Sequence, residues 1–213
     1  MQKPAIPARK TPADKTAGRL PKFQKPESVK LAMDDSTISS LLVLRRKTTS
    51  LDFDIDDALF ASLMKNPNAA VATMKINGKL EGYIVATPIS EGWVKGDVQE
   101  IKDMMLKMTK PGMDPELFEK ISKAIDSGPF YYLDDFQMAK RGDALLDMVE
   151  SFHAQLAGNS AKFIAVHVLL EDKRYKKFYN SMIKSGGFVK IHENAHTNWF
   201  GGKDFVFMVF EKP

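Results

Sequence analysis

The stretch from residue 130 onward alternates strands and helices in an order that occurs in few folds. An apolar strand at 130–138 runs into a basic, glycine-containing turn, which opens a helix that continues to Leu156. A strand at 162–170, a helix at 173–184 and two closing strands follow. A single helix between the first two strands suits a right-handed crossover, so we predict that these strands run parallel. The turn before the helix would direct free backbone N–H groups toward one point, which suits a phosphate.

Upstream of this stretch, the hydrophobic pattern predicts one α/β domain that begins near residue 29. Apolar residues recur at helical spacing in two segments, and two strands flank Asn77-Gly78, a dipeptide typical of a tight hairpin. Residues 97–127 read as an insertion of two helices, the second of which starts with Asp114 and Pro115. The expected order is a short strand at 29–33, helices near 35–44 and 55–65, strands at 69–76 and 79–89, and then the insertion.

Residues 1–28 form a segment of different character. They contain five of the eleven prolines, and residues 1–30 hold eight Lys or Arg against two acidic residues. Because the whole chain carries a net charge of +4, the remainder carries −2. A segment with so few large apolar residues cannot offset its ordering entropy by burial. We expect either a solvated tail or an arm that orders on an acidic partner, whether nucleic acid or another protein.

Composition excludes several classes of site. The chain has no cysteine, so it forms no disulfide, thiolate metal site or cysteine nucleophile, and a reducing cytoplasm fits this composition. It also has no apolar run long enough to cross a membrane and no signal-like start, so we expect no membrane partner. His192, Glu193 and His196 lack the spacing of a zinc-protease helix and lie in a predicted strand, so we expect no metal site.

The order of elements across residues 29–211 resembles the GNAT superfamily of acetyl-CoA-dependent N-acetyltransferases. The resemblance implies an α/β fold with a mixed, mainly antiparallel sheet of six or seven strands flanked by helices, and acetyl-CoA as co-substrate. In that family a Gln/Arg-x-x-Gly-x-Gly/Ala loop after a strand holds the pyrophosphate of acetyl-CoA. Gly142 and Ala144 match the last two fixed positions of this loop, whereas Ala139 does not match the first. The implied cofactor-binding residues are Met138, Lys140, Arg141, Gly142, Asp143 and Ala144.

The resemblance also points to catalytic candidates. Family members often carry a tyrosine on the helix before a Gly-Phe pair, where it protonates the departing thiolate of CoA. Tyr179 is the candidate here, although it lies about one helical turn further upstream of the Gly-Phe pair than usual. Asp134 and Asp135 are candidate bases for the attacking amine, and strand alternation predicts that they point to opposite faces. Each of the three residues also fits a structural role, as a core aromatic ring or a hydrogen-bonded carboxylate.

Two functions follow from these features. The first is an N-acyltransferase that moves an acetyl group from acetyl-CoA to an unidentified amine in the cytoplasm. The alternative is a catalytically inactive GNAT-like protein that serves as a structural or binding component of a larger assembly, such as a virion, and docks through its basic arm. An open, V-shaped cleft at the junction of strand 130–138 with helix 143–156, with free N–H groups at 141–144, would favour the enzyme. A cleft filled by side chains would favour the scaffold.

Overall fold

The computed structural model describes residues 33–48, 57–89, 112–127, 129–140, 144–197 and 203–213, together with residues 103, 106, 107 and 109. The predicted arm at 1–28, nearly all of the predicted strand at 29–33 and most of the first predicted insertion helix lie outside the described residues. None of the helices in the described ranges is long and apolar enough to cross a membrane.

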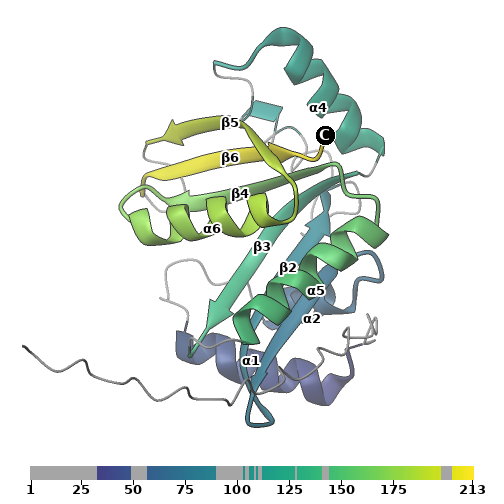
Figure 1. Cartoon of the computed structure of the whole chain (residues 1–213), viewed down its shortest axis with the longest axis vertical. Helices are drawn as coiled ribbons and strands as arrows, with labels where there is room; N and C mark the ends of the chain where they lie inside the picture. Colours follow the sequence, from purple (N-terminus) through teal and green to yellow (C-terminus); the bar gives the residue numbers. More distant parts are fainter. Residues whose placement is uncertain are drawn as a thin grey trace, which may run out of the picture.

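In the described part of the chain, six strands form a single mixed sheet (Figure 1). They are β1 (Ala70–Ile76), β2 (Lys79–Pro88), β3 (Phe130–Met138), β4 (Phe163–Leu169), β5 (Val189–His196) and β6 (Phe205–Glu211). Their spatial order is β1-β2-β3-β4-β6-β5, and β3 and β4 run parallel while the other neighbours are antiparallel. The predicted α/β class, the mainly antiparallel sheet and the parallel pairing of strands 130–138 and 162–170 are confirmed.

Helices cover both faces of this sheet (Figure 1). One face carries α1 (Asp35–Thr48), α2 (Asp57–Lys65) and α4 (Pro115–Ser127), and the other carries α5 (Ala144–Gly158) and α6 (Lys173–Ser185). Successive side chains of β2 point alternately to these two faces. Tyr83 and Val85 pack with α1 and α2, whereas Ile84 and Ala86 belong to the large core under α5 and α6. Each strand residue therefore has an assigned face, which fixes the side of the sheet on which any polar side chain lies.

The local sequence explains where several elements begin. Asp34 accepts a hydrogen bond of 2.6 Å from the backbone N–H of Thr37 at the start of α1. Asp114 accepts one of 2.9 Å from the backbone N–H of Glu116 at the start of α4, so both aspartates act as N-caps. Asn77 and Gly78 have φ values of 52° and 76°, the positive angles that a tight hairpin turn needs. The predicted helix that begins at Asp114-Pro115 and the predicted hairpin are both present.

Gly186 follows α6 and lies against the imidazole ring of His153 on α5. A Cβ atom at position 186 would stand 2.2 Å from His153 Nδ1. A 2.8 Å hydrogen bond between His153 Nε2 and the carbonyl oxygen of Met182 holds that ring in place. Gly186 has an ordinary φ of −81°, so close packing requires glycine there. The next residue, Gly187, has a φ of 84°, in the left-handed region that glycine tolerates, and it ends the helix.

We predict that Gly186→Ala lowers the free energy of unfolding by about 1–3 kcal/mol, because the added methyl group displaces a packed ring. Urea denaturation measures this change. Gly158→Ala is the matched control, since among the described residues no heavy atom lies within 4 Å of a Cβ placed there. Alanine is the better helix former, so the control should be as stable as the native protein or slightly more stable. An equal loss of stability in both variants would contradict the packing role of Gly186.

Candidate active site

β3 and β4 pair over only part of their length. Their ladder consists of three residue pairs: Phe130 with Phe163, Tyr131 with Ile164 and Tyr132 with Ala165. Beyond these pairs, β3 continues along β2 and β4 continues along β6. The two strands therefore separate toward their carboxyl ends, as Figure 1 shows, and we call this separation the β3–β4 divergence. The carboxyl ends of parallel strands are where open α/β sheets bind ligands, so the divergence is the first place to search for a site.

A β-bulge lies on β3 within the divergence. Where β2 advances by one residue, β3 advances by two, from Leu133 to Asp135, so Asp134 is an extra residue. An inserted residue shifts the alternation of side chains along its strand. Leu133 and Phe136 both pack in the core under α5 and α6, and the two aspartates between them both point to the opposite face. The prediction that Asp134 and Asp135 point to opposite faces is therefore wrong, because the bulge places both on the face of α1 and α2.

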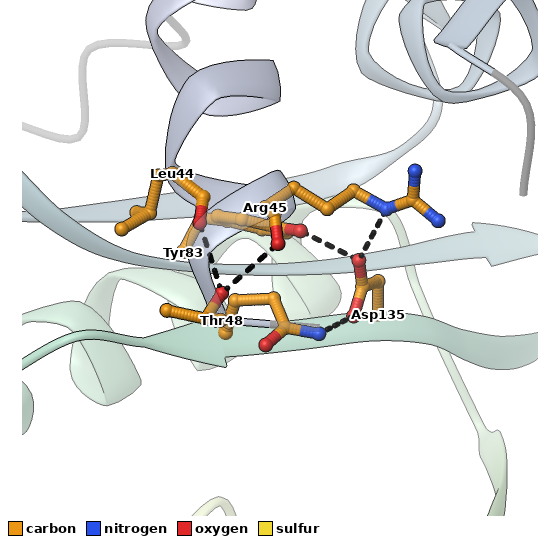
Figure 2. Close-up of polar contacts among 6 residues, drawn as sticks. Leu44, Arg45, Thr48, Tyr83 and Asp135 are labelled. Carbon is orange, nitrogen blue, oxygen red and sulfur yellow. Dashed lines mark hydrogen bonds and ion pairs between the residues drawn. The ribbon is translucent and has the colours of Figure 1, made fainter. Parts of the chain in front are cut away.

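Asp135 is held in a polar cluster between α1, β2 and β3 (Figure 2). Its Oδ2 accepts hydrogen bonds from Arg45 Nε at 3.3 Å and from the Tyr83 hydroxyl at 2.6 Å. Its Oδ1 accepts a hydrogen bond of 2.9 Å from Gln137 Nε2. Arg45 is buried and forms an ion pair with this carboxylate. Burial raises the pKa of Tyr83, and the charge of Asp135 raises it further, so the tyrosine keeps its proton as a donor. These engaged oxygens favour a structural role for Asp135.

Asp134 has a different environment. Its Oδ2 accepts a hydrogen bond of 2.9 Å from the Thr87 hydroxyl. Its Oδ1 is buried and has no hydrogen-bond partner in the part of the chain that the structure describes. Burial raises the pKa of Asp134 well above its ordinary value, and the neighbouring charge of Asp135 raises it further. A carboxyl group with a raised pKa accepts a proton more effectively near neutral pH, and a buried oxygen without a partner is a candidate ligand contact.

Tyr179 lies on α6, and its ring contacts that of Phe136 on β3 at a centroid distance of 6.0 Å. Phe178 stacks on the same ring at 4.7 Å, so aromatic side chains from α6 span the β3–β4 divergence on that face. Burial raises the pKa of Tyr179, and the charge of Asp135 on the opposite face raises it further. The structure places the ring of Tyr179 over β3 on the face of α5 and α6, whereas the carboxylates of Asp134 and Asp135 lie on the opposite face of the sheet.

Solved structures of N-acetyltransferases share the fold of this chain. The ribosomal-protein-S18-alanine N-acetyltransferase from Escherichia coli aligns over 85% of this chain and 91% of its own, at 11% identity and a TM-score of 0.53. NAA60 from Arabidopsis thaliana, solved in complex with acetyl-CoA, covers 84% of this chain and 95% of its own, at 14% identity and a TM-score of 0.50. An N-acetyltransferase from Staphylococcus aureus covers 85% of this chain and 96% of its own, at 7% identity and a TM-score of 0.50. The chain has the GNAT fold. No protein-family model and no curated protein matches its sequence.

The predicted cofactor loop of this GNAT fold follows β3. Met138 ends β3 and packs partly buried against the core, and Ala144 begins α5. Lys140 is exposed, and its Nζ lies 3.4 Å from Oε1 of the buried Glu81. The lysine charge therefore has a partner within the protein. The other three predicted cofactor-binding residues, Arg141, Gly142 and Asp143, lie outside the described residues.

A second polar pair near Asp134, Tyr132 with His167, was not predicted from the sequence. The Tyr132 hydroxyl and His167 Nδ1 lie 2.8 Å apart, and both residues belong to the face that Asp134 shares. Burial raises the pKa of Tyr132, and the charge of Asp134 adds to the effect. Burial lowers the pKa of His167 to about 3, so its imidazole is neutral at physiological pH. The available signal was a single histidine within the otherwise apolar strand β4.

Proposed function

We propose that this protein is an N-acyltransferase that transfers an acetyl group from acetyl-CoA to an amine. The observation that carries the proposal is the bulge in the β3–β4 divergence, which sets the buried Oδ1 of Asp134, without a hydrogen-bond partner among the described residues, beside the separated parallel strands. The GNAT fold supports the proposal, because solved proteins with this fold are N-acetyltransferases and one of them holds acetyl-CoA.

In this proposal Asp134 is the general base. It takes a proton from the amino group of the acceptor, so that the nitrogen lone pair attacks the thioester carbonyl carbon. The edge of β3 from Leu133 to Met138 no longer pairs with β4, and backbone N–H groups on this edge would donate to the oxyanion that forms. The new C–N bond is kept and the C–S bond breaks. Tyr179, whose raised pKa keeps it protonated, gives its proton to the departing sulfur.

The residues after β3 would hold the pyrophosphate of acetyl-CoA. Met138, Lys140, Arg141, Gly142, Asp143 and Ala144 form this proposed contact. Lys140 would exchange its carboxylate partner, Glu81, for a phosphate when acetyl-CoA binds. The Lys140 side chain is 65% exposed and can turn toward a phosphate. The Glu81 carboxylate is buried and would lose its cation, so the exchange reduces the net gain from the phosphate contact.

We expect Tyr179→Phe to lower kcat by about 100-fold, since a positioned general acid contributes roughly 10²–10⁴ to a rate. The affinity for acetyl-CoA should change little, because the substitution removes only the hydroxyl group. Release of the CoA thiol, measured with a panel of primary amines, reports turnover. Tyr175→Phe is the matched control, because Tyr175 lies one turn earlier on the same helix and is 47% exposed. Unchanged turnover in Tyr179→Phe would assign Tyr179 to packing alone.

A further inference from the structure

α6 concentrates positive charge in a domain that is otherwise acidic. The helix contains five basic residues and no acidic residue. The whole chain has a net charge of +4 and α6 contributes +5, so the rest of the chain carries −1. If residues 1–30, which carry +6, are also set aside, the remainder carries −7. A helix of this kind within an acidic domain needs an explanation beyond solubility.

The lysines of α6 lie on the face that points away from the sheet. Phe178, Tyr179, Met182 and Ile183 face the core. The outward side chains border a shallow, open hollow of about 320 Å³, lined by Lys173, Lys176, Lys177, Asn180, Ser181 and Lys184. We call Lys173, Lys176, Lys177 and Lys184 the lysine stripe. At 1.5 Å of rise per residue, the stripe extends for roughly 16 Å along the helix. This length exceeds the reach of a single phosphate and suits a linear polyanion.

The position of the lysines near the start of α6 conflicts with local helix stability. Asp172 caps α6 through a 3.1 Å hydrogen bond from the backbone N–H of Tyr175. The first two turns that follow nevertheless hold Lys173, Lys176 and Lys177 at the end of the helix where the macrodipole is positive. Acidic residues would stabilise the helix there, and cations destabilise it. Residues that break a local rule in this way are expected where function requires them.

Neighbouring carboxylates neutralise only part of the lysine stripe. Glu193 on β5 pairs with both Lys176 and Lys190. Within the described residues, no carboxylate lies within ion-pair distance of Lys173, Lys177 or Lys184, and all three side chains are exposed. Three cations are thus available on one rigid element.

We propose that the lysine stripe on the outward face of α6 binds the phosphate backbone of nucleic acid. The lysines supply regularly spaced positive charge along the helix, and the Ser181 hydroxyl adds a hydrogen-bond donor between them. The surface lies on the far side of α6 from the β3–β4 divergence, so this inference is independent of the proposed acyl transfer.

Fluorescence anisotropy of a labelled oligothymidylate, titrated with the full chain at several salt concentrations, tests this inference. The test variant is the triple substitution Lys173→Glu, Lys177→Glu and Lys184→Glu. We expect its affinity to fall at least about tenfold and its log–log salt dependence to weaken by about 2, because each lost phosphate contact removes about 0.7. Tyr175→Ala should leave binding unchanged, because Tyr175 contacts Tyr179 on the side of α6 away from the stripe. The triple variant should remain folded, since all three positions are exposed and glutamate at position 173 is favourable at the start of the helix.

The matched control makes the same change of charge elsewhere. It is the triple substitution Lys75→Glu, Lys79→Glu and Lys123→Glu, at exposed positions on β1, β2 and α4. The control should keep both the affinity and the salt dependence of the native protein. Equal weakening in both triple variants would show that net charge alone drives binding, and would overturn the inference. It would also be overturned if polyglutamate bound in preference to the oligonucleotide, or if the test variant lost calorimetric acetyl-CoA binding while its oligonucleotide binding stayed unchanged.

Discussion

Asp134→Asn should reduce acetyl transfer by at least about 100-fold and, at the same time, make the protein more stable at neutral pH. The loss of activity follows because an amide cannot take the proton of the attacking amine, and a positioned base contributes roughly 10²–10⁴ to the rate. The gain of stability follows because burial disfavours the ionised carboxyl group. Each unit by which burial raises a pKa corresponds to about 1.4 kcal/mol, and a domain of this size gains about 2–4 °C in melting temperature per kcal/mol.

The pH dependence of this stability difference has a definite sign. The unfolded chain ionises Asp134 above a pKa of about 3.8, whereas the folded chain holds the proton to higher pH. The native protein therefore loses stability relative to Asp134→Asn as pH rises above 3.8, and the two should converge below it. Thermal unfolding from pH 3 to pH 8 measures the difference.

The neighbouring carboxylate supplies the control for Asp134. Asp135→Asn should destabilise the protein, because it breaks the ion pair with the buried Arg45. Two adjacent aspartates should thus give stability changes of opposite sign. Full activity in Asp134→Asn would exclude this residue as the base, and an equal loss of stability at every pH would contradict its raised pKa.

The second large effect is expected at Arg45. Arg45→Met should lower the free energy of unfolding by about 3–5 kcal/mol, because it leaves the Asp135 carboxylate without its charged partner in a mostly buried site. The contact of the guanidinium with the Phe60 ring, 5.4 Å from the ring centroid, is also lost. Urea denaturation monitored by circular dichroism measures the change.

The adjacent arginine is a matched control for Arg45. Arg46 is on the same helix, pairs with Asp57 and has a side chain that is 65% exposed, so Arg46→Met should cost less than about 1 kcal/mol. A double variant, Arg45→Met with Asp135→Asn, should be more stable than the sum of the two single changes predicts, since both damage the same ion pair. Strict additivity would show that the loss comes from packing and not from an uncompensated charge.

Turn chemistry and periodicity predicted most of the fold. Asn77-Gly78 identified the hairpin, Asp114-Pro115 identified the start of α4, and the helix between residues 143 and 156 identified the parallel crossover. These features are local, because a turn angle or a capping hydrogen bond depends on a few neighbouring residues. The bulge at Asp134 also had a local signal. Two polar residues between Leu133 and Phe136 break the alternation of the strand.

The environment of the candidate site could not be predicted in the same way. Tyr179, Asp134 and Asp135 were found from their places in the order of elements. The partners of Asp135 were not found, because Arg45 is 90 residues and Tyr83 is 52 residues away in the chain. Only tertiary packing brings such groups together. It pairs the Asp135 carboxylate with Arg45 and leaves Oδ1 of Asp134 buried without a hydrogen-bond partner among the described residues.

Isothermal titration calorimetry of the full chain with acetyl-CoA tests the central claim most directly, namely that the β3–β4 divergence and the turn after β3 hold this molecule. We predict saturable binding at a single site, which Asp134→Asn and Tyr179→Phe retain. Gly142→Val should abolish it, because a side chain at the predicted pyrophosphate position would occupy the space of the phosphate. A folded native protein that gives no binding signal would contradict the account, and would leave the non-catalytic binding component as the function of this fold.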